Sequence, residues 1–288
     1  MSTLTSPLNE QGTSAGATLL HAHPPIEVAV NLHGLRTMMV NLYLFGEPGE
    51  RTSWTLIDGG MPGRSGAIFA AAEQLFGKDN PPQAIVLTHG HFDHIGAVGP
   101  FIKKWLVPVY AHPLEIPFLI GEQDYCPPDP SVGQGLFARL SPLFPKHAHH
   151  YGTAVHPLPE DGSVPSMPGW RWIHTPGHTP GHVSLFREKD RALIAGDAFT
   201  TTRQESFLAV CRQQIEVRPP PAYFTTDWSA SRASMQRLAD LDPQVGATGH
   251  GRVLSGPALT PHLQNLIDQF EERGVPKHGR YVRETWHG

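Results

Sequence analysis

Residues 84–94 read Ala84-Ile85-Val86-Leu87-Thr88-His89-Gly90-His91-Phe92-Asp93-His94, an apolar run followed at once by three histidines and an aspartate. Four apolar residues that lead into a polar loop predict a buried strand. Side chains alternate in direction along extended backbone, so His89 and His91 can reach a common point. Asp93 and His94 are expected to open a helix. One short loop can therefore offer two pairs of ligands.

A single histidine in a polar loop is more often an ordinary loop residue than a metal ligand. The His-x-His-x-Asp-His spacing reverses that expectation, because four such groups are expensive to bury without a metal. Imidazole and carboxylate groups suit zinc and other divalent transition metals. The stretch therefore predicts a metal site at the end of a buried strand.

The chain as a whole has the composition of a globular protein rich in turns. It has 288 residues, 39% of them hydrophobic and 17% charged, with 29 Gly and 29 Pro, which excludes a disordered protein. We expect residues 1–16, which are polar, to be disordered, and residues 17–288 to form a single domain, since no linker or fixed repeat divides them. A net charge of −4 gives no general attraction to nucleic acid, so no nucleic-acid partner is expected.

Fewer features of the sequence bear on the cellular compartment and the oligomeric state. Cys126 and Cys211 are the only cysteines and lack CxxC spacing, so a reducing cytoplasm is expected. The start of the chain has no basic region followed by an apolar one, and no stretch approaches 18 apolar residues, so no export signal or membrane span is expected. The oligomeric state is open, with a homodimer as one option.

Apolar periodicity and turn residues predict an alternation of strands and helices. The predicted strands cover residues 26–30, 38–45, 53–57, 83–87, 107–111, 170–174, 183–186 and 192–195, with one more ending at 246–251, and the predicted helices cover 66–76, 93–105, 229–241 and 259–274. The opening strands should form an antiparallel meander. The unit 83–111 should be a βαβ repeat with its polar loop at the carboxyl end of the first strand, where open α/β sheets bind ligands.

Residues 112–168 show a looser pattern, and we expect a loop insertion there. A loop of that length in a compact domain is more often functional than a plain connector. It is assigned either to a substrate lid or to a dimer contact. His147, within it, is assigned to the surface.

Three further polar motifs follow in order: Thr175-Pro176-Gly177-His178-Thr179-Pro180-Gly181-His182, Ala195-Gly196-Asp197 and Thr248-Gly249-His250. Together with His89-x-His91-x-Asp93-His94 they resemble the metallo-β-lactamase superfamily of metal-dependent hydrolases, over about residues 26–255. Any one motif alone would be weak, but four in the right order make the resemblance specific. It implies an α/β fold, a four-layer αββα sandwich of two mixed β-sheets flanked by helices.

The resemblance also implies two divalent metal ions, with Zn²⁺ preferred and Fe or Mn as alternatives. The implied ligands are His89, His91 and His178 for one ion and Asp93, His94 and His250 for the other, with Asp197 bridging the two. Open coordination positions mark a catalytic rather than a structural site, and a hydroxide bridging the metals would attack the substrate. Asp93 is the implied proton shuttle to the leaving group.

Three more residues carry weaker predictions. Asp58 is a candidate to hold a ligand imidazole through its second nitrogen, the alternative being an ordinary Asp-Gly-Gly turn. His182 is a candidate for the same support, or is simply a satisfied polar residue at the start of a strand. Lactonases of the superfamily carry a tyrosine where this chain has Thr200, and Tyr223 could replace it at the substrate if its loop folds back.

The expected reaction is hydrolysis of an ester-like bond in a small molecule, such as a lactone, a thioester or a related carbonyl substrate. Loops rich in aromatic residues suggest an apolar acyl group, though the same residues could simply pack the loops. Only about 38 residues follow His250, too few for the helical domain that glyoxalase II appends. A phosphodiesterase, or an iron-dependent redox enzyme on the same fold, is the alternative.

Overall fold

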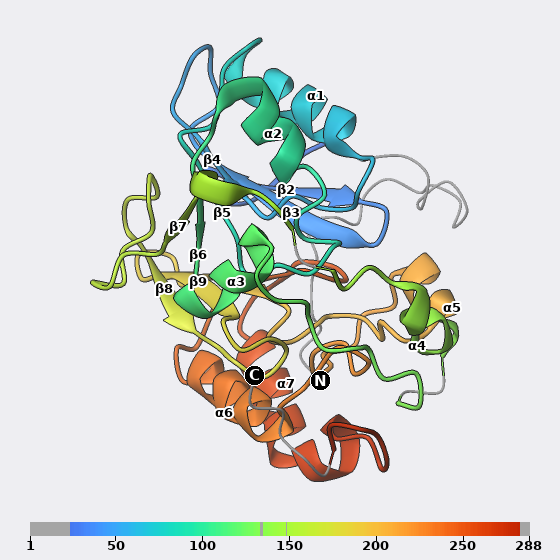
Figure 1. Ribbon diagram of the computed structural model, residues 1–288. Helices are drawn as coiled ribbons and strands as arrows, with labels where there is room; N and C mark the ends of the chain where they lie inside the picture. The colour runs from blue at the N-terminus through green and yellow to red at the C-terminus, as the bar shows by residue number, and fades with distance from the viewer. Residues whose placement is uncertain (1–23, 133–134, 148, 283–288) are drawn as a thin grey trace.

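The computed structural model describes residues 24–132, 135–147 and 149–282 of the chain, and these form two β-sheets stacked face to face between two layers of helices (Figure 1). Helices α1 (Ser65–Phe76) and α2 (Val98–Trp105) cover the outer face of the first sheet. Helices α6 (Trp228–Ala239) and α7 (Leu259–Asp268) cover the outer face of the second. The fold is thus the expected αββα sandwich. Residues 1–16, predicted to be disordered, lie outside the described ranges.

The first sheet has seven strands in sequence order: β1 (Ile26–Ala29), β2 (Leu32–Thr37), β3 (Val40–Phe45), β4 (Thr55–Ile57), β5 (Ala84–Val86), β6 (Val109–Ala111) and β7 (Val155–Pro157). Strands β1 to β4 pair antiparallel, as the predicted meander requires. Strands β4 to β7 pair parallel, and α2 makes the crossover from β5 to β6. The predicted βαβ unit is therefore confirmed.

The second sheet has five strands in the order β12-β11-β10-β9-β8: β8 (Trp170–His174), β9 (Val183–Arg187), β10 (Ala192–Gly196), β11 (Val245–Thr248) and β12 (Leu254–Ser255). Strand β9 pairs antiparallel with both β8 and β10, whereas β10 and β11 pair parallel. Both sheets are mixed, and α6 supplies the crossover between the parallel pair.

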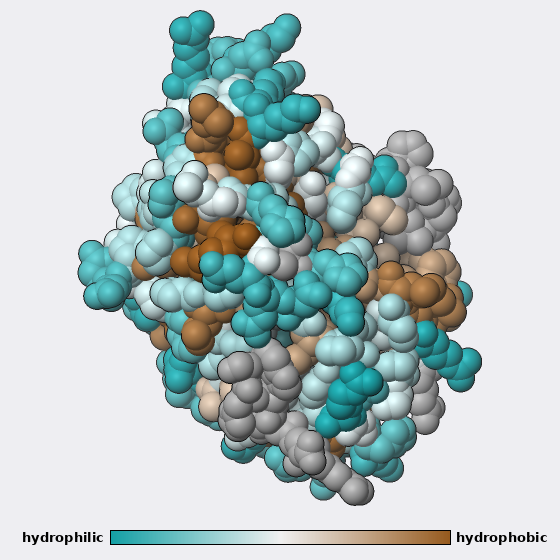
Figure 2. Space-filling view, in the orientation of Figure 1, coloured by the Kyte–Doolittle hydropathy of each residue, from teal (hydrophilic) through white to brown (hydrophobic). Residues whose placement is uncertain are grey.

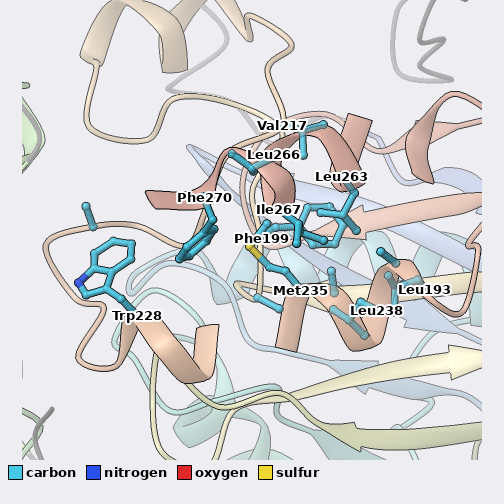
Figure 3. Close-up of a cluster of buried hydrophobic side chains, with 14 of the residues drawn as sticks. Leu193, Phe199, Val217, Trp228, Met235, Leu238, Leu263, Leu266, Ile267 and Phe270 are labelled. Carbon is cyan, nitrogen blue, oxygen red and sulfur yellow. The ribbon is translucent and has the colours of Figure 1, made fainter. Parts of the chain in front are cut away.

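Three buried clusters fill the spaces between the four layers. One, with Trp54 and Phe101, lies between the first sheet and its helices. A second, with Tyr43 and Leu185, lies between the sheets. The third packs the second sheet against α6 and α7 and is drawn in Figure 3, where Met235 and Leu263 face one another across it. Both sheets carry apolar side chains on both faces. Burial of these faces, against the other sheet on one side and against helices on the other, holds the four layers together.

The predicted loop insertion contains short regular elements. These are the 3₁₀ turns Pro113–Glu115, Ser141–Leu143 and Gly152–Ala154, helices α3 (Ile116–Ile120) and α4 (Leu136–Leu140), and strand β7. Strand β7 completes the edge of the first sheet. Helix α4 lies beside α5 (Phe207–Arg212), and Figure 2 shows an apolar patch there, which includes the exposed side chains of Leu136 and Phe207.

Several details of the predicted elements were wrong or missing. Strands β7 and β12 and helix α5 were not predicted, and the helix predicted over 259–274 is α7 followed by a π-helix over Phe270–Gly274. The helix expected from Asp93 begins only at Val98, because the backbone of residues 94–97 bonds to the loop at Gly59 and Gly60 instead of continuing a helix. Strand β2 is not apparent from the sequence, since His33 and Gly34 interrupt apolar alternation. Within the described ranges no helix is long and apolar enough to cross a membrane.

Candidate metal centre

The four polar motifs meet at one edge of the sandwich, where strands of both sheets end. The histidine loop follows β5, residues 175–182 join β8 to β9, Asp197 follows β10, and His250 follows β11. A bridge between Val40 and His250 ties the first sheet to the second at this edge. All seven predicted ligands are therefore drawn from the ends of strands, where the main chain fixes the position of each side chain.

The first group of donors is His89, His91 and His178, whose nearest donor atoms all lie within 4.8 Å of one another. His91 Nδ1 lies 2.9 Å from His178 Nε2, so two ring nitrogens approach one point. His89 Nε2 is buried and has no hydrogen-bond partner among the described residues. The unpartnered His89 Nε2 beside two converging ring nitrogens fits a divalent ion, because a buried polar atom otherwise needs a hydrogen bond.

The second group is Asp93, His94 and His250, again with donor atoms within 4.8 Å of one another. His250 Nε2 lies 3.5 Å from Asp93 Oδ2. His94 Nε2 has no hydrogen-bond partner within the described part of the chain. Asp93 is the more open member, with 14% of its side chain exposed against 2% for His250, so it is the ligand that faces the solvent side of the centre.

Asp197 lies between the two groups. Its Oδ2 atom is 3.6 Å from His94 Nε2, 3.6 Å from His178 Nε2 and 3.2 Å from His250 Nε2. Its Oδ1 atom is buried and unpartnered in the described structure. One carboxylate in contact with histidines of both groups has the geometry of a bridging ligand.

Burial favours the neutral form of three of the five ligand imidazoles. Burial lowers the pKa of His91 to about 3 and holds the pKa values of His89 and His178 well below the usual value. A neutral imidazole is the form that binds a metal, so these histidines are ready ligands. Burial alone would raise the pKa of Asp197, but the adjacent His250 and His94 outweigh it and hold that pKa well below the usual value.

Asp58, one of the weaker predictions, is in contact with the centre. Its Oδ2 accepts a hydrogen bond from His94 Nδ1 at 2.9 Å, and its two oxygens also accept from the backbone N–H and hydroxyl of Thr88. The Thr88 hydroxyl in turn lies 3.1 Å from His89 Nδ1. Asp58 thus fixes His94 directly and His89 through Thr88, which leaves both Nε2 atoms free to bind metal. Asp58 adopts a φ of 61°, a costly conformation that its three bonds offset.

His182 supports the centre without joining either group. Its Nε2 accepts a hydrogen bond from the backbone N–H of Asp197 at 2.9 Å, and its Nδ1 lies 2.9 Å from the Thr175 hydroxyl. Both ring nitrogens are therefore occupied. His250 is held in a similar way, because its Nδ1 donates to the carbonyl of Met39 at 3.1 Å.

A small pocket opens beside the first group. It is lined by His91, Tyr125, Cys126, His178, Thr179, Pro180, Phe224 and Thr226. Phe224 covers His91, with ring centroids 4.5 Å apart. Tyr223 is buried next to Phe224, and burial, followed by the nearby Asp93 carboxylate, raises the pKa of its hydroxyl well above the usual value. The loop of Tyr223 does fold back toward the centre.

The sequence prediction did not include Glu115, a buried carboxylate beside the histidine loops. It accepts hydrogen bonds from the backbone N–H of Gly90, in the loop of His89 and His91, and from that of Gly181, in the loop of His178. Burial raises its pKa, while the hydrogen bonds from Tyr125 and Thr179 act in the opposite direction. No local signal marks it, since it stands in an ordinary Pro-Leu-Glu turn. His147, by contrast, lies on the surface as expected, with 78% of its side chain exposed.

Comparisons with known proteins agree with this geometry. Residues 35–250 match the family model of the metallo-beta-lactamase superfamily. The chain is 46% identical over 244 residues to the probable metallo-hydrolase YflN of Bacillus subtilis (strain 168). The matched region covers 85% of this chain and 92% of that protein. It is 26% identical to a hydroxyacylglutathione hydrolase of Xanthomonas oryzae, over 74% of this chain and 63% of that one.

Solved structures show the same fold. The B3 metallo-β-lactamase BLEG-1 superposes with a TM-score of 0.54 at 25% identity, covering 80% of this chain and 91% of that one. The metallo-β-lactamase family protein TTHA1429 of Thermus thermophilus gives a TM-score of 0.58 at 23% identity, over 85% and 81% of the two chains.

The chain belongs to the metallo-β-lactamase superfamily. Within that class it is a metal-dependent hydrolase, and its cluster of histidines and aspartates is the candidate metal site.

Proposed function

We propose that the chain is a dinuclear hydrolase of ester-like bonds, acting on a lactone, a thioester or a related small carbonyl substrate. The observation that carries the proposal is the set of seven donors, six of them buried, that meet at the Asp197 carboxylate. His89, His91 and His178 would hold one ion, and Asp93, His94 and His250 the other, with Asp197 shared. Zn²⁺ is the preferred ion for this mixture of imidazole and carboxylate ligands, with Fe and Mn as alternatives.

Two bound divalent ions would supply Lewis acidity and lower the pKa of water toward ~7. The residues of the chain then have separate tasks. Asp58, His182 and the carbonyl of Met39 keep the ligand side chains in fixed orientations. Asp93, the more exposed of the two ligand carboxylates, is placed to pass a proton to the leaving group.

The pocket supports a small substrate with an apolar group. Phe224, Pro180 and Tyr125 form apolar walls beside the first group of donors, as is usual for sites that bind small molecules. Tyr223, a neutral phenol beside Asp93, would donate a hydrogen bond to the substrate oxygen. An acyl-glutathione, the substrate named for one relative, is a thioester and so falls within the proposed class.

The same pocket disfavours a phosphodiester substrate. None of the described residues that line it is Lys or Arg, and phosphate recognition depends on such cations. The pocket therefore supports a small molecule rather than a nucleic acid as partner.

The experiment that tests the proposal combines metal analysis with a substrate panel. The metal content of the purified protein would be measured by elemental analysis, and turnover would be followed on a lactone, a thioester, an aryl ester, a β-lactam and a phosphodiester. About two ions per chain with turnover of a carbonyl substrate is the expected result. Turnover of the phosphodiester alone, or one iron without hydrolysis, would replace the proposal with the phosphodiesterase or the redox enzyme.

A further inference from the structure

The carboxylate of Glu115, which is not one of the seven donors, accepts hydrogen bonds on both of its oxygens. Glu115 ends the 3₁₀ turn Pro113–Glu115, is fully buried, and accepts four hydrogen bonds on its two oxygens. Oε2 accepts from the backbone N–H of Gly90, at 3.0 Å, and from the hydroxyl of Tyr125. Oε1 accepts from the hydroxyl of Thr179, at 2.7 Å, and from the backbone N–H of Gly181, at 2.9 Å.

Three of these four donors belong to the loops that carry the first group of histidines. Gly90 stands between His89 and His91, and Thr179 directly follows His178. Each oxygen of Glu115 binds one backbone amide, and each amide comes from a different loop. The carboxylate is therefore a clamp that fixes the distance between the two loops.

Gly90 and Gly181 lie so close to Glu115 and Tyr125 that neither could carry a side chain. A Cβ atom at Gly181 would lie 2.8 Å from both the Cγ and the backbone nitrogen of Glu115, and a Cβ at Gly90 would overlap the Tyr125 hydroxyl. Neither position has room for a side chain, because the backbone of each loop must come within hydrogen-bond reach of the carboxylate.

We propose that Glu115 is a positioning residue that holds His89, His91 and His178 at the spacing their ion requires, and so sets the affinity of that ion alone. The inference rests on the ligand assignment of the proposed function. The second group of donors is held without Glu115, because Asp58, which also reaches His89 through Thr88, holds His94 and the Met39 carbonyl holds His250. Glu115 makes none of the hydrogen bonds described for that group.

The test uses Glu115→Gln, in which an amide nitrogen replaces one carboxylate oxygen. The hydroxyls of Tyr125 and Thr179 can turn to accept from that nitrogen, but the N–H of Gly90 or of Gly181 cannot, so one loop loses its anchor. The variant is combined with His250→Ala, which keeps the first group intact, and separately with His178→Ala, which keeps the second. Zn²⁺ affinity is measured in each background by competition with a chromophoric chelator.

Loss of a partner that orients metal ligands typically costs about 10–100-fold in metal affinity. We expect Glu115→Gln to weaken the remaining ion by that factor in the His250→Ala background and to leave it unchanged in the His178→Ala background. Equal weakening in both backgrounds, or none in either, would overturn the inference. If His178→Ala itself retains two tightly bound ions, the ligand assignment fails instead.

A second variant and a control separate positioning from folding. Tyr125→Phe removes one hydroxyl donor and leaves both amide bonds, so it should give a smaller loss with the same preference for the first group, even if Glu115→Gln does not fold. Asp129→Asn changes another buried carboxylate, which accepts from Ser131 and from the backbone of Arg280. It should lower stability without changing either Zn²⁺ affinity, and a selective loss at the first group would contradict the role given to Glu115.

Discussion

Asp197 is the residue on which the centre depends most. It is buried to 1% exposure, and its Oδ2 contacts the ring nitrogens of His94, His178 and His250 within 3.6 Å. A carboxylate so far from solvent is stable only when opposite charge lies close by. Its low pKa, held down by the adjacent histidines, keeps it charged and able to serve two cations at once.

Replacing Asp197 by Ala should reduce the bound metal to about one ion or fewer and abolish hydrolysis, because the two groups of donors lose their shared ligand. Metal content by elemental analysis and turnover on the best substrate of the panel would be measured together. The surface residue His147 provides the control, and His147→Ala should keep the native metal content. Two tightly held ions in Asp197→Ala would contradict the bridging assignment.

A second residue-scale prediction concerns Gly249, which precedes His250. A Cβ atom there would overlap Asp197 Oδ1 and come within 2.7 Å of His94 Cε1. Gly249→Ala should therefore displace the shared ligand Asp197 and the second-group ligand His94 and lower metal content, although only one methyl group is added. Gly66→Ala in α1 is the matched control, since a Cβ there meets nothing within 4 Å, and it should bind metal normally. Native metal affinity in Gly249→Ala would show that the Asp197 side chain can move aside.

At the scale of elements, the histidine loop is fixed at both ends. It leaves β5, a parallel strand in the interior of the first sheet, and it enters α2, which packs on the outer face of that sheet. Phe101 anchors α2, because it is fully buried, stacks on Phe69 with centroids 4.4 Å apart, and meets the edge of Trp54. The position of the loop therefore depends on a hydrophobic core that lies outside the site.

Phe101→Ala should destabilise the fold by about 3–5 kcal/mol, the usual cost of removing a buried phenylalanine and leaving a cavity. Chemical denaturation of the metal-free protein would give this difference in the free energy of unfolding. Lys103→Ala, on the exposed face of the same helix, should change it by less than about 0.5 kcal/mol. Similar values for the two variants would mean that α2 does not anchor the loop.

At the scale of the whole molecule, the centre joins the two halves of the sandwich. His89, His91, Asp93 and His94 follow a strand of the first sheet, whereas His178, Asp197 and His250 follow strands of the second. Each proposed ion takes ligands from both sheets. Metal binding should therefore stabilise the packing of one sheet on the other, since the unfolded chain cannot present the same ligand set.

Removal of the metal by a chelator should lower the melting temperature. An ion present at a thousandfold excess over its Kd contributes about 4 kcal/mol, which corresponds to roughly 10 °C in Tm for a chain of this size. Calorimetry with and without chelator would measure the shift, and added Zn²⁺ should reverse it. An unchanged Tm in protein shown to be metal-free would argue against ligands shared between the sheets.

The amino-acid sequence alone was enough to predict the family, the sandwich and the seven donors that the structure brings together. It was enough because each motif is a short run of residues at fixed spacing, so four motifs in order reveal the family, and the resemblance then implies the sandwich and the ligand set. The predicted strands at 83–87, 170–174 and 192–195 correspond to β5, β8 and β10, because short-range apolar periodicity marks them. Short-range periodicity and burial decide these features, and both can be read along the chain.

The tertiary structure was needed to show how the donors are held. Asp58 meets His94 across 36 residues, and Glu115 joins Gly90 and Gly181 across 25 and 66 residues. The start of α2 at Val98 and the assignment of β2 depend likewise on hydrogen bonds to other segments of the chain. Such contacts form only when burial of apolar surface brings separate segments together. No local pattern of residues indicated the contacts of Glu115, and Asp58 was a candidate only through the family resemblance.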